Sequence, residues 1–301
     1  MTAGESGAGT TNVRRAALFM VLATGLFSLM GASVKHAAAG VPDTMVVFFR
    51  NAVMLAWLVP WAARHGPSAL RTRHLGEHAV RGLMGLAAMY CFFFALARLR
   101  LADAMLLNQS FPLFVPLIER AWLRERIPRG TWRALTVGFL GVVLILRPGS
   151  AVFTAAALVG LCSAVFAAVA QVGIRRLTHT EPTTRIVFYF GLIATTVSSA
   201  PLSWSWRAPD PATWVALVAT GGFATAGQFA LTRAYANAPA ARVGPFVYVG
   251  VVFAGLLDWL VWKTPPDGVF AAGAALVVTA AALTLRRSAR PKPTTAGQMG
   301  T

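Results

Sequence analysis

The stretch Val41–Trp61, VPDTMVVFFRNAVMLAWLVPW, is apolar almost throughout, yet it carries Arg50 and Asn51 in its middle. A guanidinium is always charged, and its N–H donors match a carboxylate or a phosphate. If the stretch is a membrane helix, Arg50 lies roughly 10 Å inside one end at about 1.5 Å per residue. Because a charge at the centre of such a helix costs about 2.5–3.5 kcal/mol, Arg50 should face protein or a cavity. Two interpretations stay open: a substrate-binding group for anions, or a structural arginine that extends to the interface or bonds helix-end carbonyls.

Other apolar stretches carry uncharged polar side chains that could bind a substrate at lower cost. Asn108 and Gln109 stand just before Pro112, and a proline there frees a backbone carbonyl and bends the helix, as suits a cavity wall. Amides and phenols can bind zwitterions or amide-bearing metabolites, but they can also join helices by hydrogen bonds worth about 0.6 kcal/mol. We therefore predict these substrate-binding residues: Arg50, Tyr90, Asn108, Gln109, Gln171, Gln228 and Tyr248.

Several kinds of chemistry lack the residues that they need. The glycine-rich GESGAGTT near the N-terminus has no lysine of the phosphate-binding loop, so ATP is not expected to drive the protein directly. We place all five histidines in connections between apolar runs, which leaves no buried histidine to activate a serine. His74 and His78 flank Glu77, and we interpret this group as a solvated loop rather than a metal site. We expect no enzyme, no cofactor and no metal.

A carrier driven by protons usually needs a titratable group deep in the membrane. Glu119 stands beside Arg120 at one end of its apolar run, and Asp103 opens the same run. Asp258 lies a few residues inside the end of a later run. We interpret all three as interface or ion-pair residues and keep Asp258 as the best candidate for proton coupling. Facilitated flux down a metabolite gradient is equally compatible with this pattern.

The composition predicts a membrane protein with many spans. Of the 301 residues 56% are hydrophobic and only 12% are charged, against about 25% charged residues in a soluble domain. Apolar runs near 20 residues match the hydrocarbon core of about 30 Å. The net charge of +17 is spread over short connections, so it indicates topology and contact with membrane lipid, not nucleic-acid binding.

The runs predict an all-α integral membrane fold with ten transmembrane helices. Most of the 27 cations fall on one side if both termini are cytoplasmic, which favours a multi-pass protein of the inner membrane. Residues 1–15 and 287–301 are predicted to be disordered cytoplasmic tails. The predicted spans are 16–34, 44–63, 79–97, 103–119, 134–147, 152–174, 184–203, 212–232, 242–262 and 268–285.

The two halves of the chain resemble each other. ALARLRLADAMLL at 95–107 aligns with ALTRAYANAPAAR at 230–242, and VPDTMVVFF at 41–49 corresponds to EPTTRIVFY at 181–189. Since five helices per repeat is an odd number, the second copy must enter the membrane upside down. We therefore predict an inverted 5+5 repeat with halves 16–147 and 152–286, an architecture of secondary transporters with the substrate site at the repeat interface.

At these residues the chain resembles the drug/metabolite transporter superfamily, in particular its EamA-type members with ten helices. The resemblance is carried by the paired segments above, by SFPLFVPLIE and VGPFVYVGVV, and by the WLRERIP and DWLVWKTP ends. LFSLMGASVK before FFRN is similar to a branch that includes S-adenosylmethionine carriers. The family often has an acidic residue after helices four and nine. Glu125 fits that pattern, whereas Trp262 and Lys263 depart from it.

These observations favour a secondary transporter that moves a small polar metabolite, an amino acid or amino-acid-like compound, by alternating access. The family resemblance favours efflux. An uptake carrier for S-adenosylmethionine is the alternative, and an integral-membrane enzyme or a channel subunit are further ones. The sequence leaves the substrate, the coupling ion and the oligomeric state open.

Overall fold

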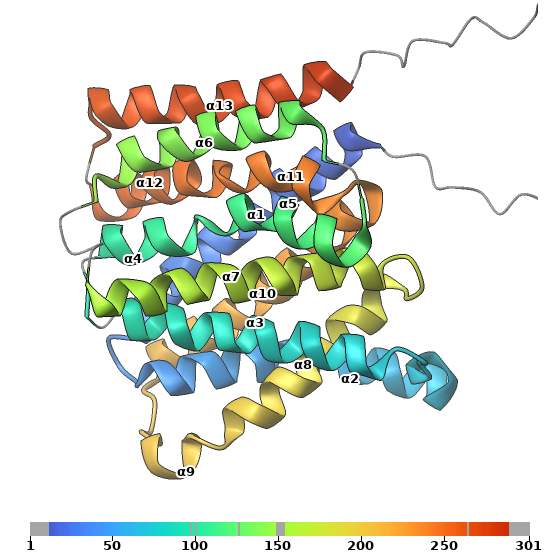
Figure 1. Ribbon diagram of the computed structural model, residues 1–301. Helices are drawn as coiled ribbons and strands as arrows, with labels where there is room; N and C mark the ends of the chain where they lie inside the picture. Colours follow the sequence, from blue (N-terminus) through green and yellow to red (C-terminus); the bar gives the residue numbers. More distant parts are fainter. Residues whose placement is uncertain are drawn as a thin grey trace, which may run out of the picture.

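The computed structural model describes residues 12–96, 98–99, 101–125, 127–148, 154–263 and 265–288, and these residues form a bundle of α-helices (Figure 1). The predicted tails 1–15 and 287–301 lie largely outside the described residues. The helices are α1 (Val13–Ala37), α2 (Asp43–Leu70), α3 (Leu75–Leu96), α4 (Leu101–Asn108), α5 (Phe111–Leu123), α6 (Arg129–Leu146), α7 (Ala155–Leu177), α8 (Thr183–Ser199), α9 (Leu202–Ser205), α10 (Pro211–Asn237), α11 (Ala240–Val247), α12 (Val249–Trp262) and α13 (Gly268–Ser288).

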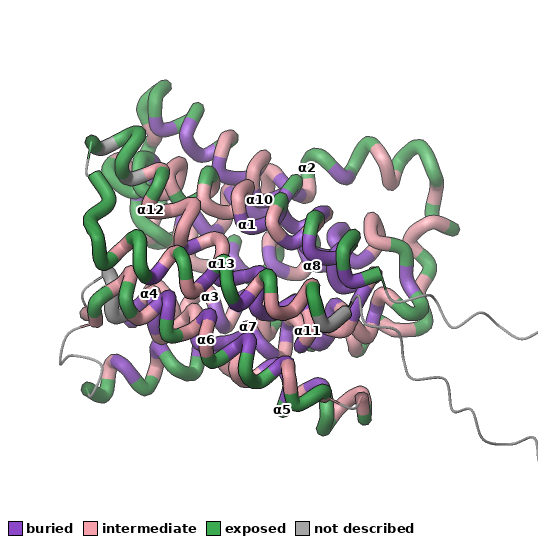
Figure 2. The backbone as a smooth tube through the Cα atoms, turned by 90° about the horizontal axis from the view of Figure 1, so that it is seen from above, coloured by how far each residue is buried: buried purple, intermediate pink, exposed green. Residues whose placement is uncertain are grey.

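The all-α membrane class is confirmed by the lengths and the apolar character of these helices. Within the described residues, eight segments are long and apolar enough to cross a membrane: α1, α2, α3, α6, α7, α10, α11 together with α12, and α13. Their outward faces carry exposed apolar side chains such as Leu18, Trp57 and Val215, while buried residues lie on the faces turned inward (Figure 2). Such an apolar exterior is what contact with lipid requires.

Two of the predicted spans are broken helices. The chain from Leu101 to Leu123 forms α4 and α5, which are separated at Gln109 and Ser110 before Pro112. The chain from Ala240 to Trp262 forms α11 and α12, which meet at Tyr248, three residues after Pro245. A helix break is therefore present where Pro112 predicts a bend. It separates two helices, since a proline removes a backbone hydrogen bond of the turn before it.

Several helix bounds differ from the predicted spans. Helix α1 begins at Val13, where the side chain of Asn12 accepts a hydrogen bond from the backbone N–H of Arg15 at 2.9 Å. Helix α2 continues across a kink at Gly66 to Leu70, and α6 begins at Arg129. Helix α8 ends at Ser199. The α2 and α6 differences have one cause: polar first and last turns continue a helix beyond the apolar run from which we predicted it.

The two halves of the chain pack against each other along their whole length. Helix α1 lies against α10 and α12, α3 lies against α7, α2 against α8, and α6 against α13. The α6–α13 contact depends on Gly141, because a Cβ there would lie 2.6 Å from the carbonyl oxygen of Gly273. Small residues of this kind let membrane helices approach closely. A cavity lies in the space between the halves.

Candidate substrate cavity

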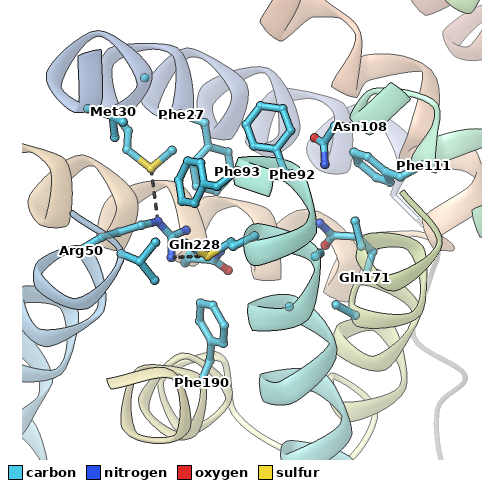
Figure 3. A pocket seen from close by; sticks show the side chains of 18 of the residues that line it. Phe27, Met30, Arg50, Phe92, Phe93, Asn108, Phe111, Gln171, Phe190 and Gln228 are labelled. Carbon is cyan, nitrogen blue, oxygen red and sulfur yellow. Dashed lines mark hydrogen bonds between the residues drawn. The ribbon is translucent and has the colours of Figure 1, made fainter. Parts of the chain in front are cut away.

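A cavity of about 330 Å³ lies between the two halves and is lined from α1, α2, α3, α4, α5, α7, α8 and α10. Its size is at the lower end of the range of about 300–1,000 Å³ that is usual for small-molecule sites. Aromatic rings form much of its wall, and a few polar side chains point into it (Figure 3). Four of the seven predicted binding residues line this cavity: Arg50, Asn108, Gln171 and Gln228.

Arg50 reaches the cavity from α2 and is only 7% exposed. Its Nη1 donates to Oδ1 of Asn51 at 2.9 Å. Its Nε lies 3.4 Å from the sulfur of Met30 (Figure 3). Asn51 is itself held by a hydrogen bond from its Nδ2 to the carbonyl oxygen of Val47. The guanidinium thus bonds side chains within the bundle, and none of its recorded hydrogen bonds among the described residues goes to a helix-end carbonyl.

Arg81 is a second arginine in the cavity, and it is not among the residues predicted to bind a substrate. It lies in the second turn of α3 and is 4% exposed. Its Nη2 donates to Oε1 of Gln228 at 3.0 Å, and its guanidinium carbon lies 3.9 Å from the centre of the Phe190 ring. The Nε of Arg81 is buried without a hydrogen-bond partner among the described residues.

The cavity holds two positive charges and no described carboxylate. No aspartate or glutamate is among its lining residues, and no ion pair recorded for the described residues includes Arg50 or Arg81. Sequence spacing suggests Glu77 as a partner of Arg81, since the two are four residues apart on one helix. Glu77 instead bonds Arg176 of α7 at 2.9 Å. A buried charge without a counter-charge is costly, so this arrangement fits a site that receives an anion.

The amide side chains occupy the rest of the polar wall. Asn108, the last residue of α4, donates from Nδ2 to the hydroxyl of Ser163 at 3.1 Å. The Oε1 of Gln171 is buried without a partner among the described residues. Since an unpaired buried acceptor is unfavourable, Gln171 is suited to accept a hydrogen bond from a bound molecule.

Gly85 makes room for Arg81, and we expect Gly85→Ala to weaken substrate binding several-fold. A Cβ at Gly85 would lie 2.6 Å from Nη1 of Arg81 and 3.3 Å from the Phe190 ring, so the guanidinium must move away from its stacked position. Gly31→Ala is the matched control, because Gly31 also lines the cavity but has no atom within 4 Å of the added carbon. Equal substrate affinities of the two variants, measured by titration of the purified proteins, would contradict this assignment.

Three predicted residues do not line the cavity. The hydroxyl of Tyr90 is buried in α3 without a described partner, and Gln109 lies in the break between α4 and α5. Tyr248 is fully buried at the junction of α11 and α12, where its ring packs 6.3 Å from that of Phe139. Asp258 belongs to α12, but its side chain lies outside the described part of the chain.

Glu119, which the sequence places at one end of its apolar run, is buried inside the bundle. It is fully buried on α5, and its two carboxylate oxygens accept the backbone N–H groups of Ala240 and Ala241 at 2.7 and 2.9 Å. These groups open α11, whose preceding residue is Pro239. A carboxylate at this position satisfies free donors and suits the helix dipole. Glu119 thus joins the two broken helices of the two halves.

The placement of the histidines in connections is wrong for His36 in α1 and His65 in α2, and also for His78. His78 lies in α3, is 1% exposed, and packs 4.5 Å from the ring of Tyr189. Helix α3 begins at Leu75, so the loop that we expected at 74–78 ends earlier. Within the described residues, no group of three or more histidine, cysteine or acidic side chains is placed to hold a metal ion.

The model of the EamA-like transporter family matches this chain twice, at residues 14–147 and 154–286. The pseudopaline exporter CntI of Pseudomonas aeruginosa (strain UCBPP-PA14) is 41% identical over 269 residues, which cover 87% of this chain and 93% of that protein. The riboflavin transporter of Brucella anthropi is 28% identical and covers 89% of this chain and 97% of its own length.

Two more distant comparisons concern one further transporter and the fold. The S-adenosylmethionine uptake transporter of Rickettsia felis is 24% identical over 260 residues, or 85% of this chain and 88% of that protein. A protein of known crystal structure superposes with a TM-score of 0.77 and 23% identity, covering 91% of this chain and 99% of the other. The structural likeness shows that the fold is shared.

Proposed function

This chain belongs to the EamA-like transporter family and is a membrane transport protein, and we propose that it exports a small polar metabolite, an amino acid or amino-acid-like compound, across the inner membrane. Arg50 and Arg81 bind the carboxylate of this cargo. Asn108, Gln171 and Gln228 contact or align its other polar groups. The cargo enters and leaves by alternating access, in which the two halves move against each other around the cavity.

The observation that carries this proposal is the pair of buried arginines without a described carboxylate beside them. Each charge is costly in the membrane, and each guanidinium is held by neighbouring side chains instead of neutralised. An anionic group of the cargo would supply the missing charge. The aromatic walls would contact the apolar part of the same molecule.

We propose further that ten helices cross the membrane as an inverted 5+5 repeat, with α4–α5 and α11–α12 each counted as one span and α8 as another. Three features support this. Pro42 precedes α2 and Pro182 precedes α8, 140 residues later. In this repeat α1 corresponds to α7, and α3 corresponds to α10. The contact of α1 with α10 in one direction therefore has its counterpart in the contact of α7 with α3. The start of α1 and the end of α13 lie at the same end of the bundle (Figure 1).

This topology corresponds to halves at 16–147 and 152–286, flanked by short cytoplasmic tails. An even number of spans puts both termini on the same side, and the arginine-rich connections favour the cytoplasm for that side. Asp258 remains our candidate for a proton-coupling group. Tyr90, Gln109 and Tyr248 then support the helices around the cavity instead of binding cargo.

Outward transport is supported by the 41% identity to an exporter. The alternative, uptake of S-adenosylmethionine, is supported by the weaker identity of 24% to such a carrier. The charge of the cavity disfavours it. A sulfonium cation would be repelled by Arg50 and Arg81, and no described carboxylate lines the cavity to bind it.

The test is a comparison of cells that express the wild-type protein, Arg50→Ala, or neither, with metabolites measured by mass spectrometry inside the cells and in the medium. We expect one group of carboxylate-bearing metabolites to rise in the medium and fall inside wild-type cells only. Accumulation of labelled S-adenosylmethionine inside wild-type cells would favour the alternative instead. Equal export by Arg50→Ala would show that Arg50 does not bind the cargo.

A further inference from the structure

The two arginines of the cavity are close neighbours. The guanidinium carbon of Arg81 lies 3.9 Å from the centre of the Phe190 ring, and that of Arg50 lies 5.9 Å from the same centre. The two groups can therefore be no further apart than the sum of these distances. They reach this ring from different helices, α2 and α3. Both positive charges therefore lie beside the same aromatic ring, close enough to repel each other.

Each guanidinium keeps free hydrogen-bonding capacity. Arg81 uses Nη2 for Gln228, while its Nε is buried without a partner among the described residues. Arg50 uses Nη1 for Asn51, and its contacts to Met30 and Met89 go to sulfur, which is a weak acceptor. Each guanidinium group is therefore charged and has several N–H donors, but these donors are only partly paired with good acceptors. A single carboxylate can compensate only one of the two charges.

The remaining walls indicate what lies between the charged groups of the cargo. Phe27, Phe92, Phe93 and Phe111 surround the cavity opposite Phe190 (Figure 3). The free Oε1 of Gln171 requires a donor, such as an amide or amine N–H. The polar and the apolar walls together suit a molecule with anionic groups, an apolar part and an N–H group.

We propose that the cargo is a dianion: a molecule with two carboxylates, one for Arg50 and one for Arg81, and an N–H group that donates to Gln171. This inference rests on the proposed function and narrows it from amino-acid-like compounds in general to those that carry a second acidic group. Phe190 and the two arginines then select a cargo by the number of its negative charges. A compound of the same shape with one carboxylate leaves one buried arginine unpaired and binds less tightly.

The experiment uses two probes of nearly identical shape, N-benzoyl-L-glutamate and N-benzoyl-L-glutamine, which differ by one negative charge. Dissociation constants are measured on the purified full-length protein, on Arg50→Gln and on Arg81→Gln. We expect the wild type to bind the dianion at least tenfold more tightly than the monoanion. Each variant should lose this preference, because only one charge remains. Arg98→Gln is the control, since Arg98 stacks on Phe94 at 3.6 Å outside the cavity and is exposed.

The outcomes separate this inference from the proposed function. Equal wild-type affinity for both probes would overturn the dianion and leave a carboxylate-binding cavity in place. Retained preference in either variant would overturn the assignment of one carboxylate to each arginine. Binding of neither probe would overturn the inference together with the proposed carboxylate cargo. The thermal midpoint of each variant without probe shows whether it is folded.

Discussion

Arg81→Gln is expected to reduce transport by about tenfold to a hundredfold while leaving the protein without cargo at least as stable as the wild type. A hydrogen bond to a charged group contributes about 1.5–3 kcal/mol, and about 1.4 kcal/mol corresponds to tenfold in affinity. The variant also removes a buried charge that no described carboxylate compensates. Transport should therefore fall while stability stays the same or rises. This is the pattern expected where a protein keeps an unfavourable group for its function.

The measurement pairs the thermal midpoint in detergent with transport per folded molecule in proteoliposomes. Arg98→Gln removes another arginine that stacks on a phenylalanine, and we expect no loss of transport from it. If Arg81→Gln lowers the midpoint by several degrees and its folded fraction transports normally, Arg81 is a structural residue and the charged cavity has another cause.

Glu119→Ala is expected to destabilise the protein by roughly 2–4 kcal/mol, because it leaves two buried N–H groups without an acceptor. These are the groups of Ala240 and Ala241 at the start of α11. Pro239, which precedes them, offers no side-chain acceptor of its own. The cap therefore comes from the other half of the chain. Its loss should loosen the junction of α5 and α11 as well as α11 itself.

Unfolding by denaturant in detergent measures this effect, and two further variants define it. Glu119→Gln keeps one acceptor oxygen and should lie between the wild type and Glu119→Ala. Glu125→Ala removes a more exposed carboxylate, 3.6 Å from Arg175, and should cost about 1 kcal/mol or less, as surface ion pairs do. If Glu119→Ala is no less stable than Glu125→Ala, the carboxylate does not act as the cap of α11.

The membrane class, the helix bend near Pro112 and four residues of the cavity could be predicted from the sequence alone. Each depends on local information. A guanidinium within an apolar run, as at Arg50, must turn inward, and a proline within a span must interrupt its hydrogen bonds. Amides such as Gln171 and Gln228 follow the same reasoning, because polar groups in a span avoid lipid.

Arg81 and Glu119 could not be placed in this way. Both lie close to the end of an apolar run, where a charge usually reaches water, so their burial depends on partners far away in the sequence. Arg81 enters the cavity because Gly85 leaves space and because Gln228 and Phe190 receive it. Glu119 is buried because α11 of the other half presents free N–H groups to it. Gly85, one helical turn after Arg81 and three residues after Gly82, is the signal in the sequence that space exists for the Arg81 side chain.

The most direct test of the central claim is an experimental structure of the protein with its cargo bound. We predict density for the cargo between α2 and α3, with its carboxylate oxygens within hydrogen-bond distance of the guanidinium groups of Arg50 and Arg81, beside Phe190. Cargo bound elsewhere in the bundle, with both arginines in the positions that they have here, would contradict the account.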